Sequence, residues 1–221
     1  MIMTTQEFEK TYWKYYLNLE NDFLGTEKYV TIDNDNKDTF SIEYMKILQM
    51  VCAEIDVVAK MLCAELSGNT NCRNIIDCCE IISEKLLDFS ENDVFFVLNN
   101  INIKPWSGWI YSNYIDEKKK NIASPSWWKD YTGVKHNRIG VIDGMCYYKK
   151  ANQHNVIYAL AALFQMEMYF YNFLADKEQK KKKTPLPKSS LFSIQRWTDM
   201  VTEGNEIFYA MEGDTLSIEK K

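Results

Sequence analysis

The sequence predicts a mainly α fold, an up-and-down bundle of four to five long helices with a small β-hairpin insertion. Apolar side chains recur every three to four residues over several long stretches, which is the pattern of amphipathic helices. Only 8 glycines and 4 prolines occur in 221 residues, which favours long helices over many tight turns. The apolar fraction of 46% and the charged fraction of 26% are typical of a globular chain.

The first two helices are indicated by their caps and their periodicity. Thr4 and Glu7 have the spacing of a capping box, so a helix is expected over about residues 5–23. Ser41 can cap a second helix that runs to about residue 66. Its apolar residues alternate at steps of three and four, which predicts a seam packed against other helices.

The middle of the chain changes from helical to β-type patterning. A third helix is expected from about residue 71. Residues 94–106 are rich in β-branched and aromatic side chains, and Asn99-Asn100 can form a turn, so this stretch predicts a hairpin. Ser124 as the N-cap, followed by Pro125 at the first helical position, then starts another helix, which is expected to loosen at Gly133 or after His136.

The last major helix, about residues 153–180, is capped by Asn152 and is apolar nearly all round, so it is expected at the centre of the bundle. We assign residues 1–180 to one helical domain, which is long enough to enclose a hydrophobic core. Residues 181–221 form a C-terminal tail that packs on the bundle or extends from it. Two short apolar runs in the tail are expected to add a small strand pair.

The composition argues against several classes of function. A net charge of −5 does not fit a chain that is basic all over and coats nucleic acid, although a local basic groove is compatible with it. The 6 cysteines form no C-x-x-C pair and only 2 histidines are present, so neither a metal site nor a cofactor is expected. No signal peptide is recognisable, and the longest apolar run is too short to span a bilayer. These observations predict a reduced, cytoplasmic protein without a membrane partner.

The most informative segment is SPSWWKDYTGVKHNR, residues 124–138, where cationic, titratable and large aromatic groups are concentrated. On a continuous helix one face holds Trp127, Tyr131, Lys135 and Arg138. His136 is rotated by about 100° from Lys135 and by about 160° from Arg138 on such a helix. The histidine and the arginine therefore converge only if the helix unwinds near its end.

Three hypotheses follow for this segment. In the first, Lys135 and Arg138 present positive charge to RNA, a nucleotide or a protein partner, and the chain is a binding or regulatory module, for example in phage defence. In the second, the chain is a metal-independent ribonuclease in which His136 moves protons while the two cations steady the phosphate. In the third, the domain is structural or binds proteins, and the basic trio is buried against carboxylates such as Glu20 or Glu54. Whether the chain is an enzyme stays open at this point.

Five further side chains are candidates for ligand binding, each with a structural alternative. The two tryptophans are expected to anchor the helix in the core, as large apolar side chains usually do. The acid at the end of the first helix could be a second acid or base, but a solvated helix end is the preferred interpretation. The asparagine can form a hydrogen bond across the bundle. These candidates are Trp127, Trp128, Tyr131, Asn155 and Glu20.

The segment PSWWKDYTGVKHNR, followed by ANQHNVIYALAALFQMEMY, resembles the helical bacterial proteins grouped with HEPN domains, and LENDFLGTEKYV with FSIEYMKILQMVCAEIDVVAK is similar to the start of such proteins. The resemblance covers most of residues 8–175. It implies a four- or five-helix bundle, often a homodimer, from a group that includes RNA-cleaving toxins and antiphage proteins. Catalytic members carry an arginine followed four to six residues later by a histidine. Here Arg138 follows His136, and Arg73 has no histidine in range, so no catalytic residue carries over. The bundle does carry over, with the suggestion that the basic segment lines its functional groove.

Overall fold

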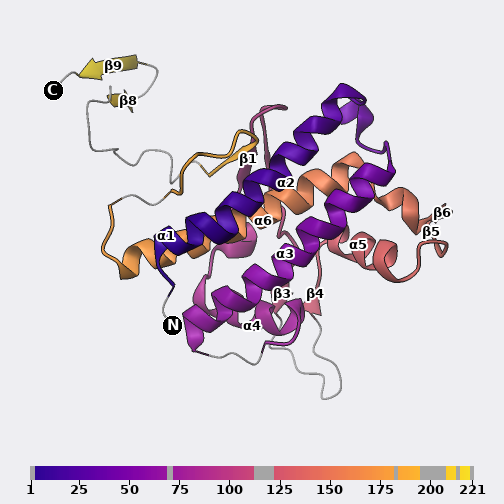
Figure 1. The fold of residues 1–221 in the computed structure, drawn as a ribbon, viewed down its shortest axis with the longest axis horizontal. Coiled ribbons are helices and arrows are strands. Elements are labelled where there is room, and N and C mark those ends of the chain that lie inside the picture. The colour runs from indigo at the N-terminus through magenta and orange to yellow at the C-terminus, as the bar shows by residue number, and fades with distance from the viewer. Residues whose placement is uncertain are drawn as a thin grey trace.

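The computed structural model describes residues 3–68, 72–111, 122–181, 184–194, 208–212 and 215–219. Long helices form the body of the molecule, with short strands at its edges (Figure 1). The mainly α fold with a small hairpin is thus confirmed. The α-helices are α1 (Thr5–Phe8), α2 (Lys14–Gly25), α3 (Ile42–Ser67), α4 (Ile75–Lys85), α5 (Ser126–His136) and α6 (Gln153–Lys177). The shorter helices are the π-helical η1 (Glu9–Trp13) and the 3-10 helices η2 (Thr26–Lys28), η3 (Asn34–Asn36), η4 (Phe89–Glu91) and η5 (Tyr147–Lys150).

The predicted N-terminal helix is present as one rod, in which η1 joins α1 to α2. The capping box is confirmed, since the Glu7 backbone N–H donates to Thr4 Oγ1 (3.2 Å) and the Thr4 N–H donates to the Glu7 carboxylate (2.8 Å). Ser41 caps α3 by accepting the N–H of Tyr44 at 3.0 Å. That helix ends at Gly68, whose left-handed conformation (φ 71°) a glycine adopts without steric cost.

One predicted cap is wrong by a residue. The N-cap of α5 is Pro125 and not Ser124, because the ψ angle of Pro125 is 151°, outside the helical range. The Pro125 carbonyl accepts the first helical N–H groups, those of Trp128 (3.1 Å) and Lys129 (3.2 Å). The helix ends at His136, as expected.

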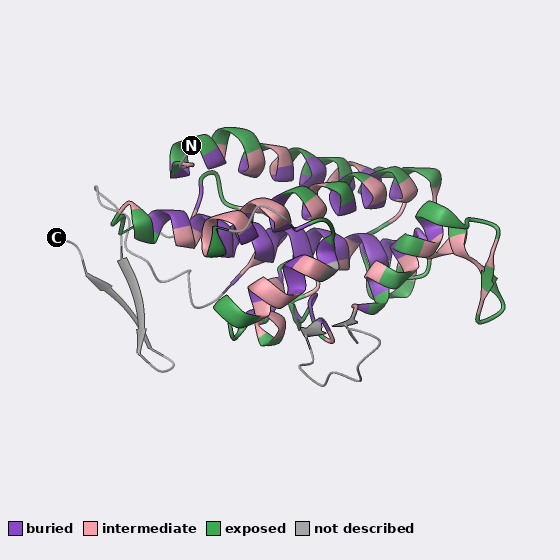
Figure 2. Cartoon of the chain, turned by 90° about the horizontal axis from the view of Figure 1, so that it is seen from below, coloured by how far each residue is buried: buried purple, intermediate pink, exposed green. Residues whose placement is uncertain are grey.

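Helix α6 is the centre of the bundle. Most of its residues are buried, as Figure 2 shows by the buried colour along it, and Asn152 caps it by accepting the N–H of Asn155 at 3.0 Å. It runs parallel to α3: Gln153 at its start donates to the Tyr44 hydroxyl (3.1 Å), and Lys177 at its end pairs with Glu65 (2.7 Å). The chain between α3 and α6 includes α4 and α5, and it returns to the end where α3 began, so that α6 can run parallel to α3. Helix α2 packs against both α3 and α6.

The predicted hairpin is confirmed, with β1 (Val94–Phe96) paired antiparallel to β2 (Ile101–Ile103). The first apolar run of the tail supplies β7 (Phe192–Ser193), which pairs with the free side of β1 and not with the second run. The remaining strands form antiparallel pairs: β3 (Ile110–Tyr111) with β4 (Ile122–Ala123), β5 (Val141–Ile142) with β6 (Met145–Cys146), and β8 (Phe208–Glu212) with β9 (Thr215–Glu219).

The described part of the tail nearest the bundle packs on it. The Trp13 indole donates to the Pro187 carbonyl at 2.7 Å. The buried Glu20 carboxylate accepts the backbone N–H of Ser190 at 2.8 Å and the Tyr16 hydroxyl at 2.6 Å. Residues 184–194 are therefore held to the first rod by polar contacts and to the hairpin by the pairing of β7 with β1. Among the described helices, none is long and apolar enough to cross a membrane.

Candidate functional site

The tryptophans at the start of α5 anchor the helix. Trp127 is buried, its indole donates to the Pro105 carbonyl at 2.6 Å, and its ring meets Trp106 edge-on with ring centres 5.6 Å apart. Trp106 in turn donates to the carbonyl of Ala162 on α6. Trp127 is therefore a structural contact and is closed to a ligand, which matches the structural alternative and not the binding role.

Two further aromatic residues of α5, Tyr131 and Trp128, differ in how far they are buried. Tyr131 is buried, and this burial raises the pKa of its hydroxyl to about 12. Trp128 is half-buried and packs edge-on against Trp127. It borders a surface hollow between the starts of α4 and α5, which is lined by Asn74, Ile75, Ser124, Trp128, Lys129 and Thr132.

The three basic residues of the segment are exposed. Lys135, His136 and Arg138, which we call the α5 cationic end, lie at the last turn of the helix and just beyond it. The Lys135 ammonium lies 5.8 Å from the centre of the Tyr131 ring, and Arg138 Nε donates to the Val134 carbonyl at 3.3 Å. Cations at this position also interact favourably with the negative end of the helix dipole. The hypothesis of a buried, salt-bridged trio is therefore wrong.

The carboxylates considered as partners are engaged elsewhere. Glu20 is buried, and its oxygens accept hydrogen bonds from the first rod and from the tail. Glu54 is half-buried on α3, and burial raises the pKa of its carboxyl. Asn155 is also buried, and its amide donates to Asp130 (3.0 Å) and to the Lys150 carbonyl (2.8 Å). Glu20 and Asn155 therefore stabilise the fold at these places, and neither is open to a ligand.

An acid–base pair for RNA cleavage is not assembled around His136. Its imidazole forms no hydrogen bond or ion pair within the part of the chain that the structure describes. The second histidine, His154, is half-buried and stacks on Tyr158 with ring centres 4.3 Å apart. Burial lowers the pKa of His154, which favours its neutral form. Among the residues that the structure describes, neither histidine has the oriented partner that general acid–base catalysis needs.

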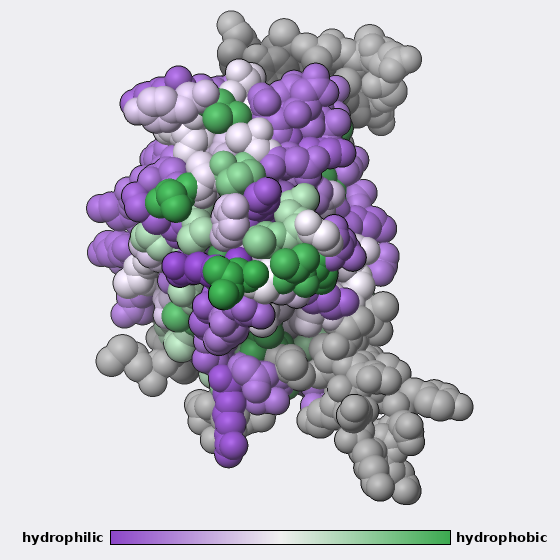
Figure 3. Space-filling view, turned by 90° about the vertical axis from the view of Figure 1, so that its right-hand side faces the viewer, coloured by the Kyte–Doolittle hydropathy of each residue, from purple (hydrophilic) through white to green (hydrophobic). Residues whose placement is uncertain are grey.

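Helix η5 extends the cationic surface next to α5. The two helices pack closely because Gly133 has no side chain: an added Cβ would lie 2.0 Å from the Tyr147 ring. Beside this contact, Tyr148 and Phe40 are exposed and meet edge-on at 5.7 Å, and the Lys149 ammonium lies 5.7 Å from the centre of the Phe40 ring. The space-filling view of this end of the molecule shows apolar groups among hydrophilic ones (Figure 3).

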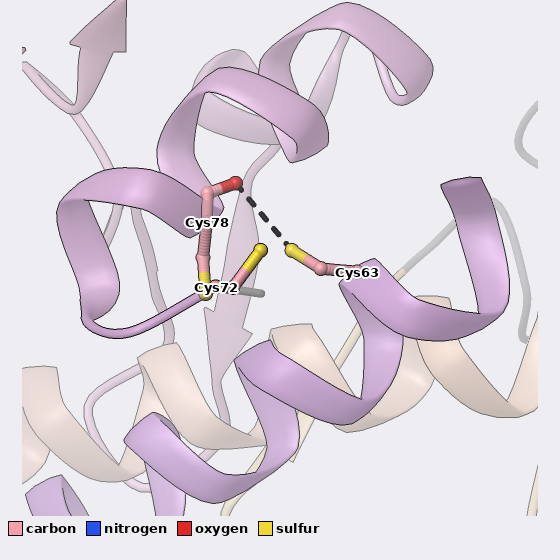
Figure 4. Close-up of side chains that lie close together, drawn as sticks. All are labelled: Cys63, Cys72 and Cys78. Atoms are coloured by element: carbon pink, nitrogen blue, oxygen red, sulfur yellow. Dashed lines mark hydrogen bonds between the residues drawn. The ribbon is translucent and has the colours of Figure 1, made fainter. Parts of the chain in front are cut away.

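A second cluster, which the sequence reasoning missed, consists of three buried thiols. Cys63 lies near the end of α3, Cys72 in the segment before α4, and Cys78 in the first turns of α4. Their sulfur atoms all lie within 4.8 Å of one another. Figure 4 shows the three side chains converging, with the Cys63 thiol also donating to the Cys78 carbonyl at 3.6 Å. We call these residues the cysteine cluster.

The three thiols influence one another's protonation. The hydrogen bond to Cys78 and burial both raise the pKa of Cys63, and burial raises the pKa of Cys72. The pKa of Cys78 is lowered, chiefly because its sulfur accepts a hydrogen bond from Cys63. Cys78 is therefore the thiol whose deprotonated form the neighbouring donors favour.

A buried acid in α6 was also missed. Glu167 is fully buried, and neither of its carboxylate oxygens has a hydrogen-bond partner among the described residues. Burial raises its pKa well above the ordinary value, and the charge of Glu54 adds to this effect. A signal was present in the sequence, because Glu167 is the one charged residue in the run FQMEMYFY, which is mostly apolar. Its protonated form is the one that the interior accepts.

Comparison with known proteins adds no family assignment. No protein-family model, no curated protein and no solved structure matches the chain.

Proposed function

We propose that the chain is a helical binding module that holds RNA on the surface formed by the α5 cationic end and η5. The observation that carries this proposal is a local reversal of charge. Between residues 129 and 150 the chain has five lysines and arginines against two aspartates, although its net charge is −5. Positive charge gathered on one surface of an acidic protein is the electrostatic pattern of phosphate binding.

The accessibility of these cations supports the proposal. Lys135 and Arg138 are exposed, and neither forms an ion pair with a described residue. Lys150, by contrast, is largely withdrawn, since its ammonium lies 3.9 Å from the Asp130 carboxylate. The cations of this stretch that remain available are therefore Lys135 and Arg138 at the end of the helix, Lys149 on η5, and Lys129 nearer the start of α5.

Exposed aromatic rings next to the cations favour a single-stranded ligand. The Phe40 ring is 43% exposed and Tyr148 is 37% exposed, so each has a face that solvent or a base can reach. Bases of single-stranded nucleic acids stack on such rings while neighbouring cations follow the backbone. The resemblance to HEPN proteins, a group that includes RNA-cleaving toxins, agrees with this ligand.

The structure supports binding over cleavage. A metal-independent ribonuclease needs a base and an acid on either side of the phosphate, and His136 has no such partner within the described residues. We expect the bound RNA to stay intact. The same proposal includes a role in phage defence, in which the module would act through the RNA that it recognises.

The test is the salt dependence of RNA binding, measured by fluorescence anisotropy with a labelled single-stranded RNA oligonucleotide. Each phosphate contact contributes about 0.7 to the slope of log affinity against log salt concentration for single strands. The double variant Lys135→Ala/Arg138→Ala removes two cations and is expected to reduce this slope by about 1.4.

A matched control is the double variant Lys10→Ala/Lys14→Ala. Both lysines are exposed and lie on η1 and at the start of α2, at the other end of the molecule from β5 and β6 (Figure 1). It removes the same charge, so it separates a local contact from a general effect of net charge. The proposal is refuted if the wild type does not bind RNA at low salt, or if both double variants lower the slope equally.

A further inference from the structure

We propose that Cys63, Cys72 and Cys78 form a binding site for a zinc ion, which ties the end of α3 to the start of α4. The site is distinct from the RNA surface in residues and in chemistry. The spacing of the cysteines along the chain does not suggest a metal site, because no C-x-x-C pair is present. The inference comes from the way the helices bring the three thiols together.

The positions of the sulfur atoms fit three corners of a zinc coordination sphere. In a tetrahedral site with Zn–S bonds of 2.3 Å, the sulfur atoms lie about 3.8 Å apart. Here all three lie within 4.8 Å of one another, so contractions of about 1 Å or less would complete the geometry. Rotations about the side-chain bonds supply movements of this size without a change in the backbone.

The convergence is specific to these three cysteines. Cys79 follows Cys78 directly and is equally buried, but its sulfur turns toward Ser83, at 3.7 Å from the hydroxyl oxygen. A disulfide would use only two of the three clustered thiols and would leave the third without a function. Three buried thiolates at one site instead form a set of soft ligands that favours a thiophilic metal ion such as zinc.

The surroundings of the cluster suit a bound cation. Cys63 and Cys78 are fully buried, while Cys72 is 8% exposed and marks the side from which an ion can enter. Binding exchanges the thiol protons for the metal and releases them to solvent, which leaves one net negative charge on a site with three thiolates.

The described residues supply three ligands and no fourth donor in the same group. A tetrahedral ion then completes its shell with a water molecule or another small donor. The consequence for the fold is a link across the corner between α3 and α4, between residues that are 15 positions apart. Because the three thiols come together only in the folded chain, a bound zinc ion would stabilise the folded state, as a structural zinc site does.

The experiment uses the full chain, reduced and freed of metal, and titrates it with Co²⁺ and then with Zn²⁺. We expect one Co²⁺ per chain with thiolate-to-cobalt charge-transfer absorption, displaced by one Zn²⁺, and a melting temperature that rises on zinc addition and falls with a chelator. Cys63→Ser and Cys78→Ser are each expected to lower the affinity for zinc at least tenfold, measured by competition with a chromophoric chelator. The matched control, Cys79→Ser, should bind zinc as the wild type does.

The outcomes divide cleanly. The proposal is overturned if the reduced wild type shows no thiolate charge transfer with Co²⁺, or if Cys79→Ser weakens zinc as much as Cys63→Ser. It is also overturned if non-reducing mass spectrometry finds Cys63 in a disulfide with Cys72 or Cys78 in the protein as isolated. The wild-type titration decides the question even if a serine variant does not fold.

Discussion

Glu167 makes the stability of the protein depend on pH in a direction opposite to that of most carboxylates. Its side chain is fully buried in α6 without a hydrogen-bond partner among the described residues, so its folded-state pKa is raised well above the ordinary value of 4.5. Above that value the unfolded chain releases the proton while the folded chain keeps it. The unfolded state then binds fewer protons, and the free energy of unfolding falls as the pH rises.

The size of the effect follows from the width of the pH window. Stability is fully present below the unfolded pKa of 4.5 and is lost progressively until the pH passes the folded pKa. Between the unfolded and the folded pKa, the loss approaches about 1.4 kcal/mol for each pH unit. The groups that act on Glu167 do not oppose this, since Glu54 raises its pKa and the two neighbouring hydroxyls, Tyr12 and Tyr16, are neutral in this range.

The substitution Glu167→Met tests this reasoning, because it keeps the length of the side chain and removes the carboxyl. The free energy of unfolding, measured by urea denaturation with reductant at fixed ionic strength, should fall from about pH 5 to about pH 7 for the wild type. It should vary less for the variant, which becomes the more stable of the two at neutral pH. The control Glu43→Gln changes a carboxyl with 53% of its side chain exposed and should keep the wild-type slope. Equal slopes for the wild type and Glu167→Met would refute the argument.

Two further predictions concern contacts that hold the surface elements in place. Gly133→Ala places a Cβ 2.0 Å from the Tyr147 ring, so we expect a loss of about 1–3 kcal/mol in the free energy of unfolding, measured by urea denaturation. An unchanged stability would mean that η5 does not pack on α5 as described. Glu20→Ala removes the acceptor of the Ser190 N–H and leaves the Tyr16 hydroxyl with Ser189 Oγ alone, at a cost of about 1–3 kcal/mol. Limited proteolysis should then cut first near Ser190, and cutting elsewhere first would contradict the proposed anchoring of the tail.

The helices could be predicted because their signals are local. The Thr4 capping box, the Ser41 cap and the Asn152 cap all form as the sequence indicates, since each cap depends on residues within one helical turn. The hairpin over residues 94–106 was predictable for the same reason. The pairing of β7 with β1 was not, because it joins segments almost a hundred positions apart and is decided by where the tail is anchored.

The sites were less predictable because they depend on tertiary contacts. The cysteine cluster forms only when α4 folds back on α3, and the spacing of Cys63, Cys72 and Cys78 does not match a familiar metal motif. Glu167 could have been found from the sequence, since a single acid among apolar residues of a central helix must be neutral or paired. The interpretation of Glu20 as a solvated helix end was wrong, because its partners come from the tail.

The residues of α5 fall into a buried group and an exposed group, and substitutions in the two groups test different properties of the protein. Trp127 and Tyr131 are 1% and 7% exposed, so their replacement would displace α5, and any loss of binding would report on the fold. Lys135 and Arg138 are exposed and make only weak contacts with the helix, so their replacement changes the charge and leaves the packing intact. Surface substitutions of this kind usually alter stability by about 0.5 kcal/mol or less. A reduced salt slope in such variants therefore reports on phosphate contacts at the α5 cationic end, which is the quantity that the proposed function requires.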